Sequence, residues 1–323
     1  MLVLAWAPAA AAARLPHPPG PAIERLLGQY GRPDAILTVY EDHSRLYADG
    51  PGVHRAALEG TGSVYTVASD AGPASPIVFK VHGGKTTAVI LGDQRLPRHD
   101  FGAEVVAAIQ SKVRADPAKL RAQALAAAPP AEKGKRPSDL VALTTIDPGI
   151  RLDVRYATDN NFMGFPLYER VGAYMQRPAA EALGRAQQAL AAQGYGLLIH
   201  DAYRPWFVTK MFWDATPPED HVFVADPAEG SKHNRGCAVD LTLYDLKSGK
   251  PVEMTGRYDE MSTRSYADFP GGTSRQRALR QILRTAMEAQ GFTVYPQEWW
   301  HFDYKDWASY GIGTVTFTEL AKR

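Results

Sequence analysis

Two short stretches in the second half of the chain carry most of its candidate catalytic side chains. The first is Ser-Lys-His-Asn-Arg-Gly-Cys-Ala-Val-Asp at residues 231–240, and the second is Glu-Trp-Trp-His at residues 298–301. Together they offer two imidazoles, one carboxylate that could complete a metal site, and a further carboxylate three residues before the last imidazole. Zinc in hydrolases takes three His or Asp/Glu ligands and leaves one position for water, while a carboxylate that does not bind the metal acts as general base. The two stretches therefore predict a zinc hydrolase.

The spacing of these residues constrains the local backbone. Apolar and polar residues alternate on either side of Asp240, which is typical of a half-buried strand with Asp240 on its polar, solvent-facing side. His233 lies seven residues earlier, a rise of roughly 10 Å in a continuous helix, so we expect Gly236 to form a turn or bulge that brings the two side chains together. Glu298 and His301 would point to opposite faces of a regular strand. Either a bulge separates them or the strand begins after Glu298.

A second candidate region is the turn Asp-Ala-Tyr-Arg-Pro at residues 201–205. Pro205 pushes Arg204 into an extended conformation and can itself occupy the first position of a helix. Arg204 would then project from a rigid corner between a strand and a helix. A fixed guanidinium suits a developing oxyanion or a substrate carboxylate, because it is planar, permanently charged and able to donate two parallel hydrogen bonds. The alternative is an ordinary surface salt bridge.

Other residues of metal-binding type lack convincing ligand spacing. We expect structural or surface roles for the remaining histidines, which are His17, His43, His54, His82, His99, His200 and His221. Among them His200 is the least certain, because it ends an apolar run that leads into the turn at 201–205. Cys237 is expected to be a buried small side chain. As the single cysteine, it excludes an intramolecular disulfide and indicates little about the redox compartment.

The order of the motifs resembles the D-alanyl-D-alanine dipeptidase family, zinc peptidases that include the vancomycin-resistance dipeptidase. The shared pattern is Ser-x-His-x-x-Gly-x-Ala-x-Asp followed by Glu-Trp-Trp-His. The similarity runs from about Asp147 to about Tyr304, about half of the chain, and includes the stretches 154–162, 194–198, 203–205 and 258–259. Several separated motifs in the right order make this resemblance specific.

The resemblance implies a set of catalytic roles. One zinc ion per chain would be held by His233, Asp240 and His301. Glu298 would be the catalytic base, and Arg204 would stabilise the transition state. The implied activity is hydrolysis of the dipeptide D-alanyl-D-alanine to D-alanine, linked to cell-wall peptide metabolism.

The resemblance also implies how the small dipeptide substrate is held. Asp259, with help from the neighbourhood of Tyr156, would anchor the amino group of the dipeptide. Ser231 would contact its carboxylate. A dipeptidase must hold both termini of its substrate, and Asp259 supplies a negative charge suited to an ammonium group.

Two alternatives stay open. The D,D-carboxypeptidases of the wider zinc D-peptidase group trim longer peptidoglycan stem peptides, and they usually have Pro in place of Trp299. Trp299 therefore favours the dipeptidase branch. The second alternative is a zinc-binding module that has lost catalysis. The presence of Glu298 argues against it, because a purely structural site needs no free base.

Length and charge fit this interpretation. A chain of 323 residues with 45% hydrophobic residues can bury one substantial core and a smaller one. A formal net charge of +1, with no basic run, argues against nucleic acid as a main partner. The sequence does not indicate an oligomeric state.

The first residues resemble part of a secretory signal. Residues 1–13 are apolar and end in alanines, a pattern like the core and cleavage site of a signal peptide, although the usual basic start is missing. This stretch is too short to span a bilayer, and no other segment is a transmembrane candidate. We expect export to the periplasm, with a cytoplasmic location as the alternative. An exported enzyme would meet the dipeptide as released wall material or as a nutrient.

The chain is expected to contain two domains. Residues 20–115 predict a small β-rich domain with turn-punctuated antiparallel strands at 36–40, 45–48, 63–67, 77–81 and 86–91, and a short helix at 103–114. Residues 116–140 predict a helix and a linker, since 126–137 is rich in Ala, Pro and charge. Residues 141–323 would form the catalytic domain. No chemistry is evident in the smaller domain, whose role stays open.

Mixed helices and strands predict an α+β catalytic domain. Helices are expected at 178–193 and at 275–290, the second one capped by Ser274. Strands are expected at 195–200, 241–244, 251–254, 292–295 and 299–304. The absence of strict βαβ alternation favours α+β over a doubly wound fold. The family resemblance implies the same class, the antiparallel-sheet, hedgehog-like fold of zinc D-Ala-D-Ala peptidases.

Overall fold

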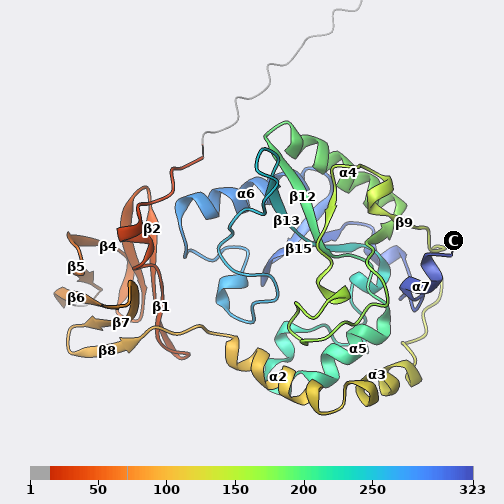
Figure 1. Ribbon diagram of the computed structural model, residues 1–323, viewed down its shortest axis with the longest axis horizontal. Coiled ribbons are helices and arrows are strands. Elements are labelled where there is room, and N and C mark those ends of the chain that lie inside the picture. The colour runs from red at the N-terminus through yellow and green to blue at the C-terminus, as the bar shows by residue number, and fades with distance from the viewer. Residues whose placement is uncertain (1–14, 71, 323) are drawn as a thin grey trace, which may run out of the picture.

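The computed structural model describes residues 15–70 and 72–322. A β-sheet unit from the first third of the chain lies at one end of the long axis, and a larger unit of mixed helices and strands lies at the other (Figure 1). The signal-like stretch at 1–13 lies outside the described residues. Within the described part, no helix is long and apolar enough to cross a membrane.

The first unit is an eight-stranded antiparallel sheet in which each strand pairs with the next along the chain. A short helix, α1 (Pro21–Glu24), precedes β1 (Gly28–Arg32), β2 (Ala35–Asp42), β3 (Arg45–Gly50), β4 (Val53–Thr61), β5 (Val64–Ser69), β6 (Gly72–His82), β7 (Lys85–Leu91) and β8 (Gln94–Pro97). The two outer strands also meet, because Tyr30 forms a bridge with Arg98 and the His99 amide donates to the Gln29 carbonyl at 3.1 Å.

The five strands expected here are present, and three others were missed. The missed strands are β1, β4 and β8. Each lacks the usual β-prone composition: β1 contains two glycines, β4 carries His, Arg and Glu, and β8 has four residues and ends in proline. Their pairing is decided by neighbouring strands, since strand preference depends strongly on tertiary context.

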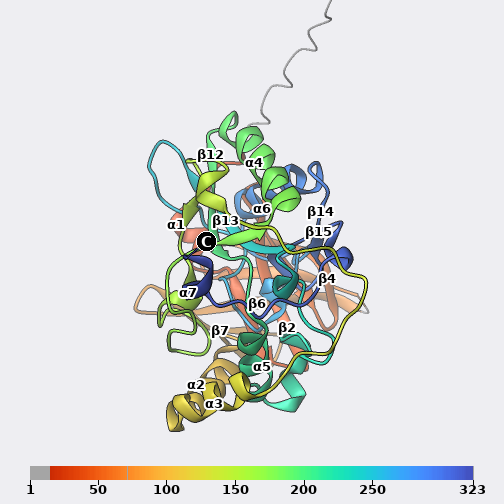
Figure 2. The same ribbon diagram turned by 90° about the vertical axis from the view of Figure 1, so that its right-hand side faces the viewer.

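Helices α2 (Ala103–Ala115) and α3 (Pro117–Ala126) connect the two units. They run along the lower side of the larger unit beside α5 (Trp206–Ala215), as Figures 1 and 2 show. Ile109, Val113 and Ala124 are buried in the same apolar cluster as residues of α5. The connection is therefore packed against the larger unit along most of its length.

The larger unit is built on a five-stranded sheet in the order β10–β12–β13–β15–β14. Its strands are β10 (Arg151–Leu152), β12 (Tyr195–Asp201), β13 (Ala238–Asp245), β14 (Phe292–Tyr295) and β15 (Glu298–Tyr304). All pairs are antiparallel except β10 with β12. A second sheet pairs β9 (Leu140–Ala142) with β11 (Tyr174–Gln176), and α7 (Phe317–Leu320) lies near the C-terminus. The molecule therefore has mixed helices and strands around a mainly antiparallel sheet.

Helices α4 (Arg177–Ala191) and α6 (Ser274–Glu288) cover one side of this sheet, while α2, α3 and α5 lie on the other (Figures 1 and 2). Val239, Leu241 and Leu243 of β13 belong to the apolar core that contains the buried residues of α4 and α6. Successive side chains of a strand point to opposite faces. Asp240 therefore points away from these two helices.

Three expectations for this unit need correction. Asp240 is buried rather than solvent-facing, because every residue of β13 except the last is buried by layers on both faces. Residues 251–254 are not a strand, and Pro251 makes only an isolated bridge to Tyr244. The cap of α6 is Thr273, which forms a reciprocal capping box with Gln276, rather than Ser274.

Candidate metal centre and active site

Three candidate ligands meet on the face of the sheet opposite α4 and α6. Asp240 on β13 lies directly opposite His301 on β15, and His233 sits in a short 3₁₀ turn (His233–Arg235) that ends at Gly236 with φ +67°. This turn confirms the expected use of Gly236, since a positive φ is strained for other residues. One ligand atom from each of the three residues lies within 4.8 Å of the other two.

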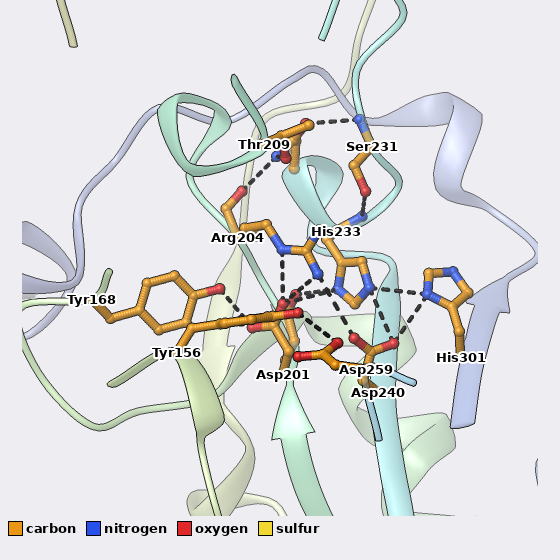
Figure 3. A network of polar contacts seen from close by, with 12 residues as sticks. Tyr156, Tyr168, Asp201, Arg204, Thr209, Ser231, His233, Asp240, Asp259 and His301 are labelled. Carbon is orange, nitrogen blue, oxygen red and sulfur yellow. Dashed lines mark hydrogen bonds and ion pairs between the residues drawn. The ribbon is translucent and has the colours of Figure 1, made fainter. Parts of the chain in front are cut away.

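Hydrogen bonds to the two histidines decide which nitrogen of each ring faces the space between the three candidate ligands. His233 Nδ1 donates to the Ala202 carbonyl at 2.6 Å, and His301 Nε2 donates to Asp303 at 2.9 Å. Each imidazole uses one nitrogen in this way, so His233 Nε2 and His301 Nδ1 are the nitrogens that face the space between the three side chains, 3.0 Å apart (Figure 3). Metal-binding histidines are usually oriented by such partners. The three side chains therefore fit a buried metal site of two nitrogens and one carboxylate.

The charges at this site favour a cation. Burial alone would raise the pKa of Asp240, but the two adjacent imidazoles outweigh it and hold that pKa well below its usual range. Burial would lower the pKa of His301, but Asp303 and Asp240 outweigh it and raise that pKa well above its usual value. The cluster thus retains a proton in the absence of a metal, and a metal ion would displace that proton on binding.

Glu298 lies beside the ligands without joining them. Its Oε2 is 3.6 Å from His301 Nδ1. Val294 of β14 pairs with Phe302, but the next residue, Tyr295, pairs with Glu298, so the pairing of β15 is irregular between Glu298 and Phe302. This irregularity is the expected bulge, and Glu298 lies within β15 rather than before it.

Burial raises the pKa of Glu298 to about 7, with His301 opposing the rise. A carboxylate with this pKa suits proton transfer near neutral pH.

Arg204 lies between two carboxylates at the end of β12. Its Nε and Nη2 lie 2.9 and 2.8 Å from the same oxygen of Asp201, and Nη2 lies 3.7 Å from Asp240. Tyr168 donates to the other oxygen of Asp201 at 2.6 Å. The strand-to-helix corner is as expected, although Pro205 is the N-cap of α5 and not its first helical residue. Arg204 and Asp201 are both buried, so the alternative of a surface salt bridge is wrong.

Asp259 presents an unsatisfied carboxylate oxygen. Its Oδ1 accepts a hydrogen bond from Tyr156 at 2.9 Å, while its buried Oδ2 has no partner among the described residues. Burial, with the charge of Asp240 nearby, raises the pKa of Asp259 well above its usual range. Its backbone adopts φ +58°. Figure 3 shows Asp259 beside Asp240 and beneath Tyr156. A buried acceptor without a partner is costly unless a ligand supplies the donor.

Ser231 lies on the other side of the ligands. Its Oγ accepts a hydrogen bond from the His233 amide at 3.2 Å, and its own amide donates to Asn234 at 2.7 Å. Ser231 thus supports the turn that carries His233. Its hydroxyl hydrogen is still available to a bound molecule, because the bond to His233 uses only a lone pair of Oγ.

All the predicted site residues line one cavity of about 310 Å³. They are Tyr156, Arg204, Ser231, His233, Asp240, Asp259, Glu298 and His301. Residues 222–226 and Met261 form other parts of its wall. This volume is at the small end of the range for small-molecule sites.

The structure adds supporting residues that sequence reasoning missed. Asp303 orients His301 and is itself held by Lys232 at 2.6 Å, and Tyr258 donates to Asp240 Oδ2 at 3.0 Å. Asp303 could have been found, because it lies two residues after His301 and so on the same face of the strand. Asp201 and Tyr258 lie in stretches that the sequence analysis singled out, but only their side-chain partners reveal their supporting roles.

Two residues set aside as structural are buried near the site. His200 packs on the ring of Tyr258 with centroids 4.7 Å apart, and its Nδ1 lies 3.3 Å from the Asp153 carbonyl. It therefore supports Tyr258, which holds Asp240. Cys237 is fully buried, and burial raises the pKa of its thiol to about 12. This confirms it as a buried small side chain.

Known proteins share this half of the chain. The Peptidase_M15 family model, described as D-ala-D-ala dipeptidase, matches residues 136–319. A D-alanyl-D-alanine dipeptidase of Escherichia coli (strain K12) is 35% identical over 175 residues, covering 54% of this chain and 89% of the relative. Another, of Enterococcus faecium, is 38% identical over 179 residues, covering 49% of this chain and 87% of the relative.

Among solved structures, the LdcB LD-carboxypeptidase aligns at a TM-score of 0.30 and 22% identity, over 55% of this chain and 70% of that one, an overlay too loose to bear on the fold. The match to the family model covers the residues that line the cavity. The chain is a peptidase that belongs to the M15 family of D-Ala-D-Ala dipeptidases.

Proposed function

We propose that this chain is a zinc dipeptidase that hydrolyses D-alanyl-D-alanine to two molecules of D-alanine. The observation that carries the proposal is the pairing, in one cavity of about 310 Å³, of a three-ligand metal cluster with the unsatisfied carboxylate of Asp259. Relatives named D-alanyl-D-alanine dipeptidase support the choice of substrate. The hedgehog-like form of the fold is part of the same proposal.

Zinc is the metal that suits these ligands. Two imidazoles and one carboxylate, from His233, His301 and Asp240, form the set found at catalytic zinc sites that keep a position open. When bound, zinc supplies Lewis acidity, which polarises the scissile carbonyl and makes water a better nucleophile. The partners behind the imidazoles, the Ala202 carbonyl and Asp303, orient the two rings so that His233 Nε2 and His301 Nδ1 would bind the ion.

Glu298 is the proposed general base. It would take a proton from the attacking water as the oxygen of that water bonds to the carbonyl carbon. It would then pass the proton to the leaving amine as the carbon–nitrogen bond breaks. A pKa of about 7 lets one carboxylate both accept and release that proton near neutral pH.

Arg204 is the proposed group that stabilises the oxyanion. Its guanidinium is held on one side by Asp201 and reaches the cavity on the other. Because Asp201 and the rings of Phe212 and Tyr156, 4.7 and 5.3 Å away, fix its position, no reorganisation is needed as negative charge develops.

Asp259 and Ser231 are the proposed contacts to the two termini. Asp259 Oδ2 would accept from the substrate ammonium, with Tyr156 holding the other carboxylate oxygen. Ser231 would donate its hydroxyl hydrogen to the substrate carboxylate. Both residues line the cavity that also holds the candidate metal ligands.

A carboxypeptidase acting on longer stem peptides is the second candidate, and a silent zinc-binding module is the third. A longer substrate carries no ammonium where Asp259 stands, and its acyl group would leave the carboxylate unpaired. The test is hydrolysis of free D-Ala-D-Ala by the zinc-loaded protein, compared with N-acetyl-D-Ala-D-Ala. Turnover of the free dipeptide supports the proposal. Preference for the acylated compound favours a carboxypeptidase, and activity on neither favours the binding module.

We also propose a division into a small domain at residues 20–115, a connection at 116–140 and a catalytic domain at 141–323. A further proposal is that the enzyme is exported to the periplasm. The apolar, alanine-rich start of the sequence supports export. Cell fractionation with sequencing of the mature N-terminus tests the location. A chain that keeps Met1 in the cytosolic fraction would rule out export.

A further inference from the structure

The substrate anchor Asp259 belongs to a segment that lies between the cavity and the N-terminal β-sheet unit. We define the anchor segment as residues 257–272. It is irregular apart from a 3₁₀ turn at Thr263–Ser265 and leads directly into α6. The family model begins at residue 136, so the β-sheet unit lies outside the region matched to the family. Contacts between this unit and the segment are therefore a feature of this chain beyond the matched region.

The end of the anchor segment is bonded to β2. The Glu41 amide donates to the Gly272 carbonyl at 3.0 Å. The Glu41 side chain is fully buried and accepts from the Ser274 amide at 2.8 Å and from its hydroxyl at 3.1 Å. Arg277 of α6 donates to Asp42 at 2.9 Å. A buried carboxylate with charge-assisted bonds at the start of a helix ties the two units firmly together.

The middle of the segment is contacted by the same unit and its connection to α2. Gln29 donates to Thr263 Oγ1 at 3.1 Å. Gly102, just before α2, lies against the backbone of Met261 so closely that a Cβ atom at residue 102 would lie 2.5 Å from the Met261 carbonyl oxygen. These contacts lie within four residues of Asp259 in the sequence.

Asp259 itself holds an unfavourable conformation. A positive φ of +58° in a residue other than glycine is strained, and its buried Oδ2 lacks a partner among the described residues. A second cavity, of about 370 Å³, lies behind the segment and shares Phe162 and residues 259–261 with the first. Because open space lies on both sides of Asp259, dense packing does not explain how it is held. Such strain persists only where surrounding contacts impose it.

We infer that the N-terminal β-sheet unit is a positioning element of the peptidase, which holds the anchor segment so that Asp259 faces the substrate ammonium. Gln29 and Glu41 are its positioning residues. This inference rests on the proposed function, since it assigns Asp259 to the amino end of the dipeptide. It gives the β-sheet unit a role in substrate affinity without placing any of its residues in contact with substrate.

The test uses two variants of the full, zinc-loaded chain, Gln29→Ala and Glu41→Gln. Glu59→Gln is the matched control, because it makes the same change on an exposed strand of the same sheet. We expect KM for free D-Ala-D-Ala to rise about fivefold in both variants, the scale of one lost hydrogen bond. The value of kcat, the zinc content and the inhibition constant of N-acetyl-D-Ala-D-Ala should stay unchanged, because these do not depend on an ammonium contact.

Combining each variant with Asp259→Ala separates positioning from general destabilisation. If Gln29 and Glu41 act through Asp259, they add nothing to KM once its carboxylate is gone. Equal further losses in the Asp259→Ala background would overturn the inference. So would equal weakening of the free and acylated dipeptides in the single variants.

Hydrogen exchange supplies a readout that does not need activity. Amides of residues 257–272 should exchange faster in Gln29→Ala and Glu41→Gln than in the parent and in Glu59→Gln, while β13 and β15 stay protected. Unchanged exchange in the segment overturns the inference. A parent protein that fails to hydrolyse the free dipeptide defeats the proposed function instead, and the exchange measurement then still decides whether the β-sheet unit holds the segment.

Discussion

The metal cluster and the anchor segment line the same cavity but are built in opposite ways. Asp240 and His301 stand opposite each other on paired strands, and each candidate ligand has a further polar partner. Asp259 stands on an irregular segment with a positive φ, an unsatisfied oxygen and support from another unit of the chain. The candidate metal ligands therefore rest on regular paired strands, whereas the proposed substrate anchor depends on contacts from a separate unit.

The largest effect is expected from the ligands. Replacing His233, Asp240 or His301 by Ala should abolish both zinc binding and activity, because two ligands cannot hold the ion in a buried site. Zinc content of the purified variants, measured by atomic spectroscopy beside the activity on D-Ala-D-Ala, checks this. Full metal occupancy in all three variants would contradict the ligand assignment.

Glu298→Ala should separate metal binding from turnover. Zinc should stay bound, while kcat falls by about 10² or more, the scale of a positioned acid–base group. The same metal and activity measurements apply, with the ligand variants as the comparison. Loss of zinc together with activity would make Glu298 a ligand and would remove the distinction between the cluster and its base.

Asp259→Ala should affect recognition alone. The free dipeptide should lose about tenfold or more in kcat/KM, since a charge-assisted bond to its ammonium disappears. N-acetyl-D-Ala-D-Ala, used as an inhibitor, should bind as before. Zinc content should not change. Equal losses for both compounds would show that Asp259 does not bind the amino group.

The two aspartates should give opposite pH dependences of stability in the metal-free protein. The pKa of Asp259 is raised above its unfolded value, so the native state holds its proton longer and stability falls as the pH rises above about 4. The pKa of Asp240 is lowered below its unfolded value. The stability that this carboxylate contributes is therefore present above about pH 4 and is lost as the pH falls further.

Urea unfolding of Asp259→Asn and Asp240→Asn between pH 3 and pH 8 checks this smallest effect. Asp259→Asn should reduce the loss of unfolding free energy toward high pH. Asp240→Asn should reduce the loss toward low pH. If the free energy of unfolding changes with pH in the same way in both variants, the two aspartates do not differ electrostatically.

The metal half of the site could be predicted because its residues are close in sequence. The stretch 231–240 contains two candidate ligands and the turn that joins them, and the stretch 298–301 contains the third candidate ligand and the proposed base. Arg204 was predictable because Pro205 marks the strand-to-helix corner. Residue type and spacing were sufficient there, since a turn or a bulge is a local property of the backbone.

The supporting residues could not be predicted in the same way. Asp201 is held by Tyr168, and Tyr258 contacts Asp240, side chains that are distant in sequence. The strands β1, β4 and β8 likewise depend on their neighbours in the sheet. The expected exposure of Asp240 was wrong because alternation indicates which face a residue occupies, but not whether another layer covers that face.

The sequence by itself determined the candidate ligands, the proposed base and the order in which they occur along the chain. These follow from the chemistry of the side chains and from short-range backbone geometry. Only the tertiary structure decided that Asp240 is buried, that Glu298 has a pKa of about 7, and that Asp259 lies beneath Tyr156 on a segment held by β-strands far away in the sequence. Burial and charge interactions depend on distances in space, and those distances are set by how remote segments pack together.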